Sequence, residues 1–174
     1  MVLENSVDLE VLPAYCQARV LILGVGNILF GDDGFGPAVI EALQGRFAIP
    51  DEMYVMDAGT GVRKILFTLL IGEVHPSEIV IVDAVDWGSK IGEVKIISPD
   101  DLPITKIDDF SLHQIPTSNM LRELQEHCQV KISIVVCDVG ALSQEIKPGL
   151  TPETAEAVQT AALKIATQFV LDPL

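Results

Sequence analysis

The sequence predicts an α/β fold, namely a three-layer α/β/α sandwich with a mostly parallel, twisted sheet of about five strands and one antiparallel edge strand. Short runs rich in valine, isoleucine and leucine carry apolar residues at consecutive positions, which is typical of strands buried on both faces of a parallel sheet. Segments with helical spacing lie between these runs, and strands that alternate with helices form βαβ units. The chain has 174 residues, 49% of them hydrophobic, which is enough for one domain with a sizeable core.

In the first half of the chain, two buried strands are predicted at residues 19–24 (RVLILG) and 53–57 (MYVMD). The helix between them is predicted from apolar residues at i, i+3, i+4, i+7 and i+8, which are Phe35, Ala38, Val39, Ala42 and Leu43. Gly45 is expected to end this helix, since glycine is favoured just after a helix C-terminus. The same spacing predicts the next helix through Val62, Ile65, Leu66, Leu69 and Leu70.

In the second half, buried strands are predicted at residues 78–83 (EIVIVD) and 131–138 (KISIVVCD), and an alternating, solvent-facing edge strand at 93–97 (EVKII). Thr117 is expected to cap a helix that carries Met120, Leu121, Leu124 and Cys128. The last helix has Thr151 as a suitable N-cap and Pro152 at its first position. Its expected apolar face consists of Ala155, Val158, Ala162, Ile165 and Phe169.

We expect two parts in the chain: residues 1–18 as a loosely attached N-terminal arm, and residues 19–174 as a single α/β domain. The chain carries 11 Lys+Arg against 25 Asp+Glu, a net charge of −14. Such an acidic balance argues against a large basic surface for nucleic acid or anionic membranes. No apolar run approaches the roughly 20 residues that span a bilayer, and the acidic N-terminus does not resemble a secretory signal. Three cysteines without a CxxC pair fit a reducing compartment, so we expect a soluble cytoplasmic protein.

Acidic residues follow the predicted parallel strands. The first strand leads into a GDDG loop with Asp32 and Asp33, and the later buried strands end at Asp57, Asp83 and Asp138. In open α/β sheets the functional crevice lies beyond the carboxyl ends of the strands. Carboxylates gathered there repel one another unless hydrogen bonds, helix N-termini or a cation compensate. The alternative, that Asp57 and Asp138 only cap turns, remains open, and Asp138 is interpreted as part of a solvated surface.

The glycine-rich first loop does not match a nucleotide-binding pattern. A dinucleotide fingerprint G-x-G-x-x-G would require a glycine where Leu29 stands, and a Walker-type loop would require a lysine where Pro37 stands. The adjacent aspartates also disfavour an anion. A cation therefore fits this loop better than a phosphate does.

His113 is the candidate nitrogen ligand for such a cation, because it precedes a predicted helix in the segment SLHQIP. One imidazole with Asp33 and Asp83 would form an N/O ligand set that Zn²⁺, Ni²⁺ or Co²⁺ accepts. The three residues are far apart in sequence, so their spacing alone does not establish a metal site.

Five segments resemble the hydrogenase maturation proteases, which remove a C-terminal extension from the large subunit of [NiFe] hydrogenases. They are GVGNILFGDDGFG at 24–36, DAGTG at 57–61, IVDA at 81–84, SLHQ at 111–114 and GLTP at 149–152. The resemblance runs in order over residues 19–170 and leans toward the type that serves coenzyme F420-reducing hydrogenases.

This resemblance implies metal ligands at Asp33, Asp83 and His113, although some relatives have glutamate in place of Asp33. It implies catalytic carboxylates among Asp33, Asp57 and Asp83. It also implies that Gly59, Thr60 and Gly61 position the substrate. The metal would be Ni²⁺ supplied by the substrate, with Zn²⁺ or Cd²⁺ able to replace it in the isolated protein, and no further cofactor is expected.

The implied function is that of a metal-dependent, aspartic-type endopeptidase. It would recognise nickel already inserted in the hydrogenase large-subunit precursor, cleave the C-terminal extension and act as a monomer. No HExxH zinc helix and no GxSxG elbow occur in the sequence. The alternative is a noncatalytic nickel-sensing protein or metallochaperone of hydrogenase assembly.

Overall fold

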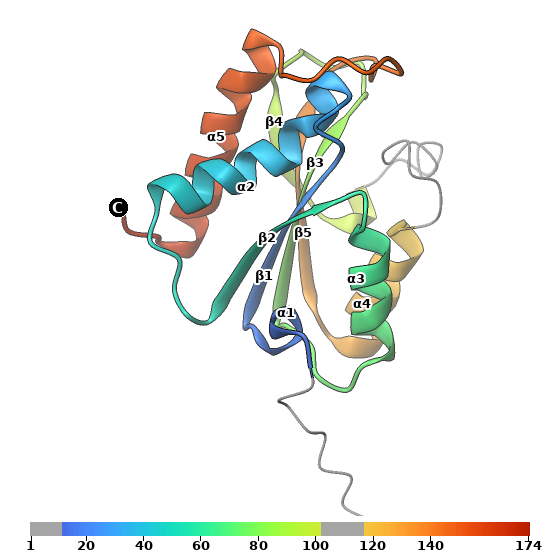
Figure 1. Cartoon of the computed structure of the whole chain (residues 1–174). Helices are drawn as coiled ribbons and strands as arrows, with labels where there is room; N and C mark the ends of the chain where they lie inside the picture. Colours follow the sequence, from blue (N-terminus) through green and yellow to red (C-terminus); the bar gives the residue numbers. More distant parts are fainter. Residues whose placement is uncertain (1–11, 102–116) are drawn as a thin grey trace, which may run out of the picture.

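Five strands form one sheet in the order β2-β1-β3-β5-β4 in the computed structural model, which describes residues 12–101 and 117–174 (Figure 1). The strands β1, β2, β3 and β5 run parallel, and β4 pairs antiparallel with β5 at the edge. Their bounds are β1 Val20–Val25, β2 Met53–Gly59, β3 Glu78–Val85, β4 Val94–Ile97 and β5 Lys131–Asp138. The predicted mostly parallel sheet with one antiparallel edge strand is confirmed.

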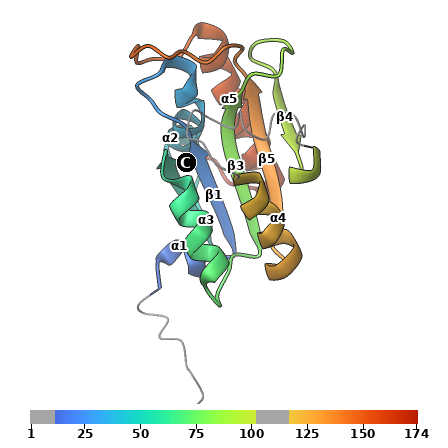
Figure 2. The same ribbon diagram turned by 90° about the vertical axis from the view of Figure 1, so that its right-hand side faces the viewer.

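Helices cover both faces of this sheet. They are α1 Ala14–Gln17, α2 Phe35–Arg46, α3 Val62–Ile71, α4 Thr117–Cys128 and α5 Pro152–Phe169. The helices α2 and α5 lie on one face, and α3 and α4 lie on the other (Figures 1 and 2). Each face has its own apolar cluster, and every residue of the central strand β1 is buried. The three predicted layers are confirmed. An apolar strand such as β1, which is buried on both faces, needs helices on both sides of the sheet.

Two details of the helices differ from the sequence-based expectation. Gly45 does not end α2; it is exposed inside the helix, and Phe47 is the C-cap, whose N–H donates to the Leu43 carbonyl. Gly45 keeps helical backbone angles, so the positive φ that favours glycine after a helix is not required there. In α5, Thr151 is the N-cap as predicted and accepts from the Thr154 amide, but Ala155 is exposed while Ala157 and Ala161 are buried.

The segment before β1 is not entirely a loose arm. Residues 14–17 form the short helix α1, in which Cys16 is only 3% exposed. The ring of Tyr15 meets that of Tyr54 edge-on, with 6.5 Å between centroids. These contacts place the last residues of the expected arm against the α3 and α4 side of the sheet, while residues 1–11 lie outside the described ranges.

The end of the chain packs against the segment after α2. The amide of Ala48 donates to the Asp172 carbonyl at 2.8 Å, and the amide of Leu174 donates to the Arg46 carbonyl at 3.0 Å. Val170 ends α5 with a left-handed backbone, φ 54°, which turns the chain back toward α2. Among the described helices, none has the length and hydrophobicity needed to cross a bilayer.

Candidate functional site

The candidate site lies where the strand order of the sheet reverses. Strand β1 connects through α2 to β2 on one side, whereas β3 lies on its other side and leads toward β5. Such a switch point leaves a crevice beyond the carboxyl ends of the two central strands. The loops that follow β1, β3 and β5 gather at this end of the sheet (Figure 1).

Asp33 lies at this crevice in a short 3-10 helix, η2 (Gly31–Gly34), between β1 and α2. It is fully buried, and its Oδ2 accepts the amide of Asn27 at 2.7 Å. Two glycines allow the backbone to pack closely enough to place Asp33 here. Gly26 has φ +130°, and a Cβ on it would lie 1.8 Å from the carbonyl oxygen of Asp33. Gly36 brings the first turn of α2 onto the backbone of the central strands, because a Cβ there would lie 2.2 Å from the carbonyl oxygen of Val25.

Asp83 lies near the end of β3 and is 1% exposed. Its Oδ1 accepts the amide of Ala84 at 2.9 Å. Burial raises the pKa of Asp83 well above its usual range, the negative charge of Asp33 raises it further, and the Ala84 amide offsets only part of this. The structure therefore brings together two buried carboxylates that destabilise each other when both are ionised.

A cation would compensate this repulsion, and a pair of carboxylates suits a divalent metal. The pair comprises two of the three predicted metal ligands. The third, His113, lies outside the described residues. Within residues 12–101 and 117–174, no group of three or more His, Cys, Asp or Glu residues is arranged to hold a metal ion. The described part of the site could supply the two carboxylates of Asp33 and Asp83 to such an ion.

Asp57 points to a different face of the sheet from Asp83. In β2, Met53 and Val55 pack on the α2 and α5 side of the sheet, and the alternation of the strand places Asp57 on that side. In β3, by contrast, Asp83 alternates with Ile81 and Val85, which pack on the α3 and α4 side. The side chains of Asp57 and Asp83 therefore point to opposite faces of the sheet.

Asp57 instead lines a cavity of about 680 Å³ beside α2. The cavity is bounded by α2 residues, by Ile28 and Gly31 of the first loop, and by Gly149 and Leu150 of the loop before α5. Asp57 is exposed, and its Oδ1 accepts the Gly59 amide at 2.7 Å, so the carboxylate also caps the turn after β2.

The predicted positioning segment, Gly59 to Gly61, forms that turn. Gly59 has φ +49°, and its carbonyl accepts the Gly26 amide at 3.2 Å. Thr60 is exposed, and Gly61 precedes α3 and donates its N–H to the Ala58 carbonyl. The turn is thereby fastened to the loop that carries Asp33 while its outer side stays accessible.

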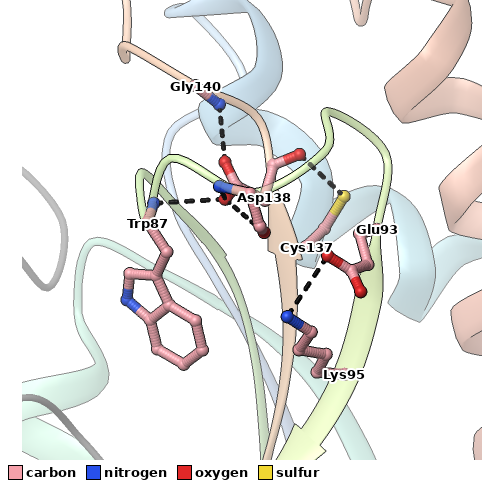
Figure 3. A network of polar contacts seen from close by, with 7 residues as sticks. Trp87, Glu93, Lys95, Cys137, Asp138 and Gly140 are labelled. Carbon is pink, nitrogen blue, oxygen red and sulfur yellow. Dashed lines mark hydrogen bonds and ion pairs between the residues drawn. The ribbon is translucent and has the colours of Figure 1, made fainter.

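The prediction that Asp138 is part of a solvated surface is wrong. It is 2% exposed and accepts hydrogen bonds from the amides of Trp87, Ser89 and Gly140 and from the Ser89 hydroxyl (Figure 3). Burial alone would raise the pKa of Asp138, but these hydrogen bonds outweigh it and lower the pKa. Asp138 thus holds the loop between β3 and β4 against the end of β5.

The neighbouring Cys137 is also buried, and its thiol lies 3.7 Å from the Asp138 carbonyl oxygen (Figure 3). Burial first, and then the charges of Asp138 and Asp32, raise its pKa to about 12. A thiol that stays protonated at neutral pH is a poor nucleophile, so Cys137 has a packing role.

Asp32 holds the first loop to α5, a contact that sequence reasoning missed. Its Oδ1 accepts the Thr151 amide at 2.7 Å, and its Oδ2 accepts the Thr151 hydroxyl at 2.9 Å. The Lys147 amide also donates to the Leu29 carbonyl at 2.9 Å. No local pattern signals this pairing, because the two loops are more than a hundred residues apart in sequence.

Comparison with known proteins identifies relatives of the whole fold. The model of a family described as hydrogenase maturation protease matches residues 37–168. A Methanocaldococcus jannaschii protein named for the same protease family is 36% identical over 143 residues, which cover 82% of this chain and 90% of that protein. The coenzyme F420 hydrogenase subunit delta of Methanothermobacter thermautotrophicus is 32% identical over 162 residues, which cover 91% of this chain and 96% of that protein.

A solved structure agrees with these matches. The crystal structure of a [NiFe] hydrogenase maturation protease from Thermococcus kodakarensis superimposes with a TM-score of 0.65 at 27% identity, covering 86% of this chain and 91% of that chain. The likeness therefore extends over the sheet and both helical layers, not over one motif alone.

Proposed function

The chain belongs to the hydrogenase maturation protease family, a family of processing endopeptidases, and from this premise we propose how it acts. It removes the C-terminal extension from the large-subunit precursor of a [NiFe] hydrogenase after nickel has been inserted. The resemblance to the subunit delta of a coenzyme F420 hydrogenase points to a precursor of the F420-reducing type. Nickel is here part of the substrate.

The observation that carries this proposal is the buried pair Asp33 and Asp83 at the switch point of the sheet. Both carboxylates are at most 1% exposed, and the charge of Asp33 raises the pKa of Asp83. Such a pair is costly in the free protein and is stabilised when a cation arrives. Together with His113, the pair would complete the coordination of the nickel that the precursor carries, which would also polarise a nearby carbonyl group.

The remaining residues act on the peptide. The turn from Gly59 to Gly61 lies between β2 and α3, where its glycines permit close approach of another backbone. Asp57 is a candidate general base, because it is exposed at the end of β2 and oriented by the Gly59 amide. It would accept a proton from the attacking water and return it to the amine that leaves when the peptide bond breaks. Asp33 and Asp83 are the other candidate catalytic carboxylates.

The experiment is to mix the purified protein with nickel-loaded and nickel-free precursor and to measure the mass of the large subunit. We expect the shortened subunit only from the nickel-loaded form. Asp83→Ala and His113→Ala should abolish the shortening while the circular dichroism spectrum stays unchanged. Equal cleavage of both precursor forms would contradict recognition of nickel. Nickel transfer with no shortened subunit would favour the metallochaperone alternative.

A further inference from the structure

The outer face of α2 is hollowed along its length. The 680 Å³ cavity beside Asp57 adjoins a second one of about 460 Å³ that lies between α2 and α5. Both are lined by Ala38, Glu41, Gly45 and Leu150, and together we call them the α2 groove. From Pro37 to Gly45 the groove follows α2 for about 12 Å at the rise of an α-helix, a length that roughly four residues of an extended peptide would fill.

Small side chains produce this hollow, and they leave one acidic residue in its middle. Pro37, Ala38 and Gly45 contribute little volume, whereas Glu41 lies between the two cavities and is exposed. Glu41 forms no hydrogen bond or ion pair with another described residue. Among the described residues, Asp57 is the only other charged residue that lines the larger cavity, and it is also acidic.

The basic residue nearest in sequence does not neutralise Glu41. Arg46 lines the smaller cavity, but its Nη1 donates to Gln159 Oε1 and its guanidinium lies 5.5 Å from the centre of the Phe47 ring. Apart from Arg46, no described lysine or arginine lines either cavity. A carboxylate that faces a groove of small, mostly apolar residues without a partner favours a cationic side chain in the occupant.

The groove is continuous with the site described above. Gly34, which lines the larger cavity, follows Asp33 directly in the chain, and Asp57 lines the cavity at the end of β2. Gln44, which also lines the larger cavity, fixes α2 to the edge strand β2, because its Nε2 donates to the Val55 carbonyl at 2.9 Å. A chain that passes the Asp33 and Asp83 pair could therefore continue along α2.

We propose that the α2 groove holds an extended segment of the precursor next to the cleaved bond and that Glu41 selects a lysine or arginine side chain in it. This inference rests on the proposed function. Glu41 is a specificity-determining residue in it, not a catalytic one, because it lies on the outer face of α2 and not at the carboxylate pair. Its removal should therefore weaken substrate binding and leave the chemical step unchanged.

The test measures kcat and KM for nickel-loaded precursor with the wild-type protein, Glu41→Gln and Glu41→Lys. We expect KM to rise about threefold to tenfold in Glu41→Gln and by more than tenfold in Glu41→Lys, with kcat unchanged. Glu126→Lys is the matched control, because Glu126 is an exposed carboxylate on α4, on the opposite face of the sheet, and forms no ion pair with another described residue. It should leave both constants unchanged.

The substrate side completes a double-mutant cycle. Each lysine or arginine near the cleaved bond of the precursor is changed to glutamine, one at a time, and one of these changes should raise KM for the wild-type protein but not for Glu41→Gln. Changing that same residue to glutamate should restore binding to Glu41→Lys. An unchanged KM in Glu41→Gln, or losses that simply add, would overturn the inference.

Two other outcomes separate the inference from its premise. If wild-type protein leaves nickel-loaded precursor uncut, the proposed function fails, whatever Glu41 does. If Glu41→Lys changes the mass of the protein in solution measured by light scattering but not KM, a second copy of this chain covers the groove, and the inference fails while the proposed function stands.

Discussion

The charge of Asp83 lowers the stability of the free protein. Removing this charge should therefore raise stability and abolish activity. Burial and the charge of Asp33 raise its pKa, so the ionised form destabilises the folded state. The cost is present when pH exceeds the raised pKa and absent below the usual aspartate pKa of about 3.9. Asn keeps the oxygen that accepts the Ala84 amide and removes the charge.

We therefore expect Asp83→Asn to unfold at a higher temperature than the wild type at pH 8 and to lose precursor processing. A change of 1 kcal/mol moves the melting temperature of a domain of this size by roughly 2–4 °C, so a gain of a few degrees is expected. Scanning calorimetry measures it, and the gain should fade toward pH 4. A lower melting temperature at pH 8 would show that the charge is already compensated in the free protein.

Asp138 predicts the reverse dependence on pH. Its hydrogen bonds to backbone amides and to Ser89 lower its pKa, so it stabilises the fold above the usual aspartate pKa. This contribution is lost as pH falls through the lowered pKa of the folded state. Asp138→Asn should lower the free energy of unfolding by about 1–3 kcal/mol at pH 7, with a smaller difference below about pH 4.

Urea denaturation at pH 7 and at pH 3.5 measures this effect, with Glu126→Gln as a control for the loss of one exposed carboxylate. The control should match the wild type at both values. A difference between Asp138→Asn and the wild type that is equally large at pH 3.5 would mean that the shape of the side chain, and not its charge, holds the loop.

Sequence reasoning worked unevenly for single residues. It grouped Asp33 with Asp83, because carboxyl ends of neighbouring parallel strands meet at one edge of a sheet. It placed Asp138 on the surface, since nothing in the sequence shows that three amides converge on it. It passed over Glu41, because an acidic residue on an amphipathic helix normally lies in solvent, and only the packing of α2 reveals the groove.

At the scale of one element, α2 contains two glycines with different roles. Close packing requires Gly36, whereas no described residue packs against Gly45. A Cβ on Gly36 would lie within 2.5 Å of the Val82 carbonyl oxygen as well as against Val25, both rigid backbone. A Cβ on Gly45 would meet no atom within 4 Å. The same substitution should therefore have opposite signs at the two positions.

We expect Gly36→Ala to destabilise the protein by about 3 kcal/mol or more, since either α2 or the sheet must move. Gly45→Ala should stabilise it by roughly 0.5–1 kcal/mol, because alanine loses less backbone entropy in a helix. Chemical denaturation of both variants measures the pair. Equal effects would contradict the close contact of α2 with β1 and β3.

The strands were predictable as elements, whereas the ends of the helices were less so. Runs such as VLILG identify strands because burial on both faces excludes polar residues, and that requirement is local. The helix α2 ends at Arg46 with Phe47 as its C-cap, and Phe47 packs into the core there, so Gly45 did not mark the end. At α5, the Thr151 cap was correct because its hydrogen bond is local.

For the whole molecule, the fold class followed from the sequence but the order of the strands did not. Alternation of strands and helices limits the chain to βαβ units, yet the side on which each strand is added depends on contacts between distant segments. The same limit applies to the site. The sequence predicted a crevice with Asp33 and Asp83, but it did not show that Asp57 also lines the α2 groove, which depends on how α2 packs beside β2.

The position of α5 also has a consequence for synthesis of the chain on the ribosome. Its residues Ala157, Val158, Ala161, Ala162 and Ile165 complete the apolar cluster beneath α2, and residues 172–174 then pair with the segment after α2. All of this lies after the last strand, so the nascent chain carries all five strands with the α2 face of the sheet only partly covered until α5 leaves the exit tunnel. The apolar surface exposed during that interval makes the growing chain prone to aggregation.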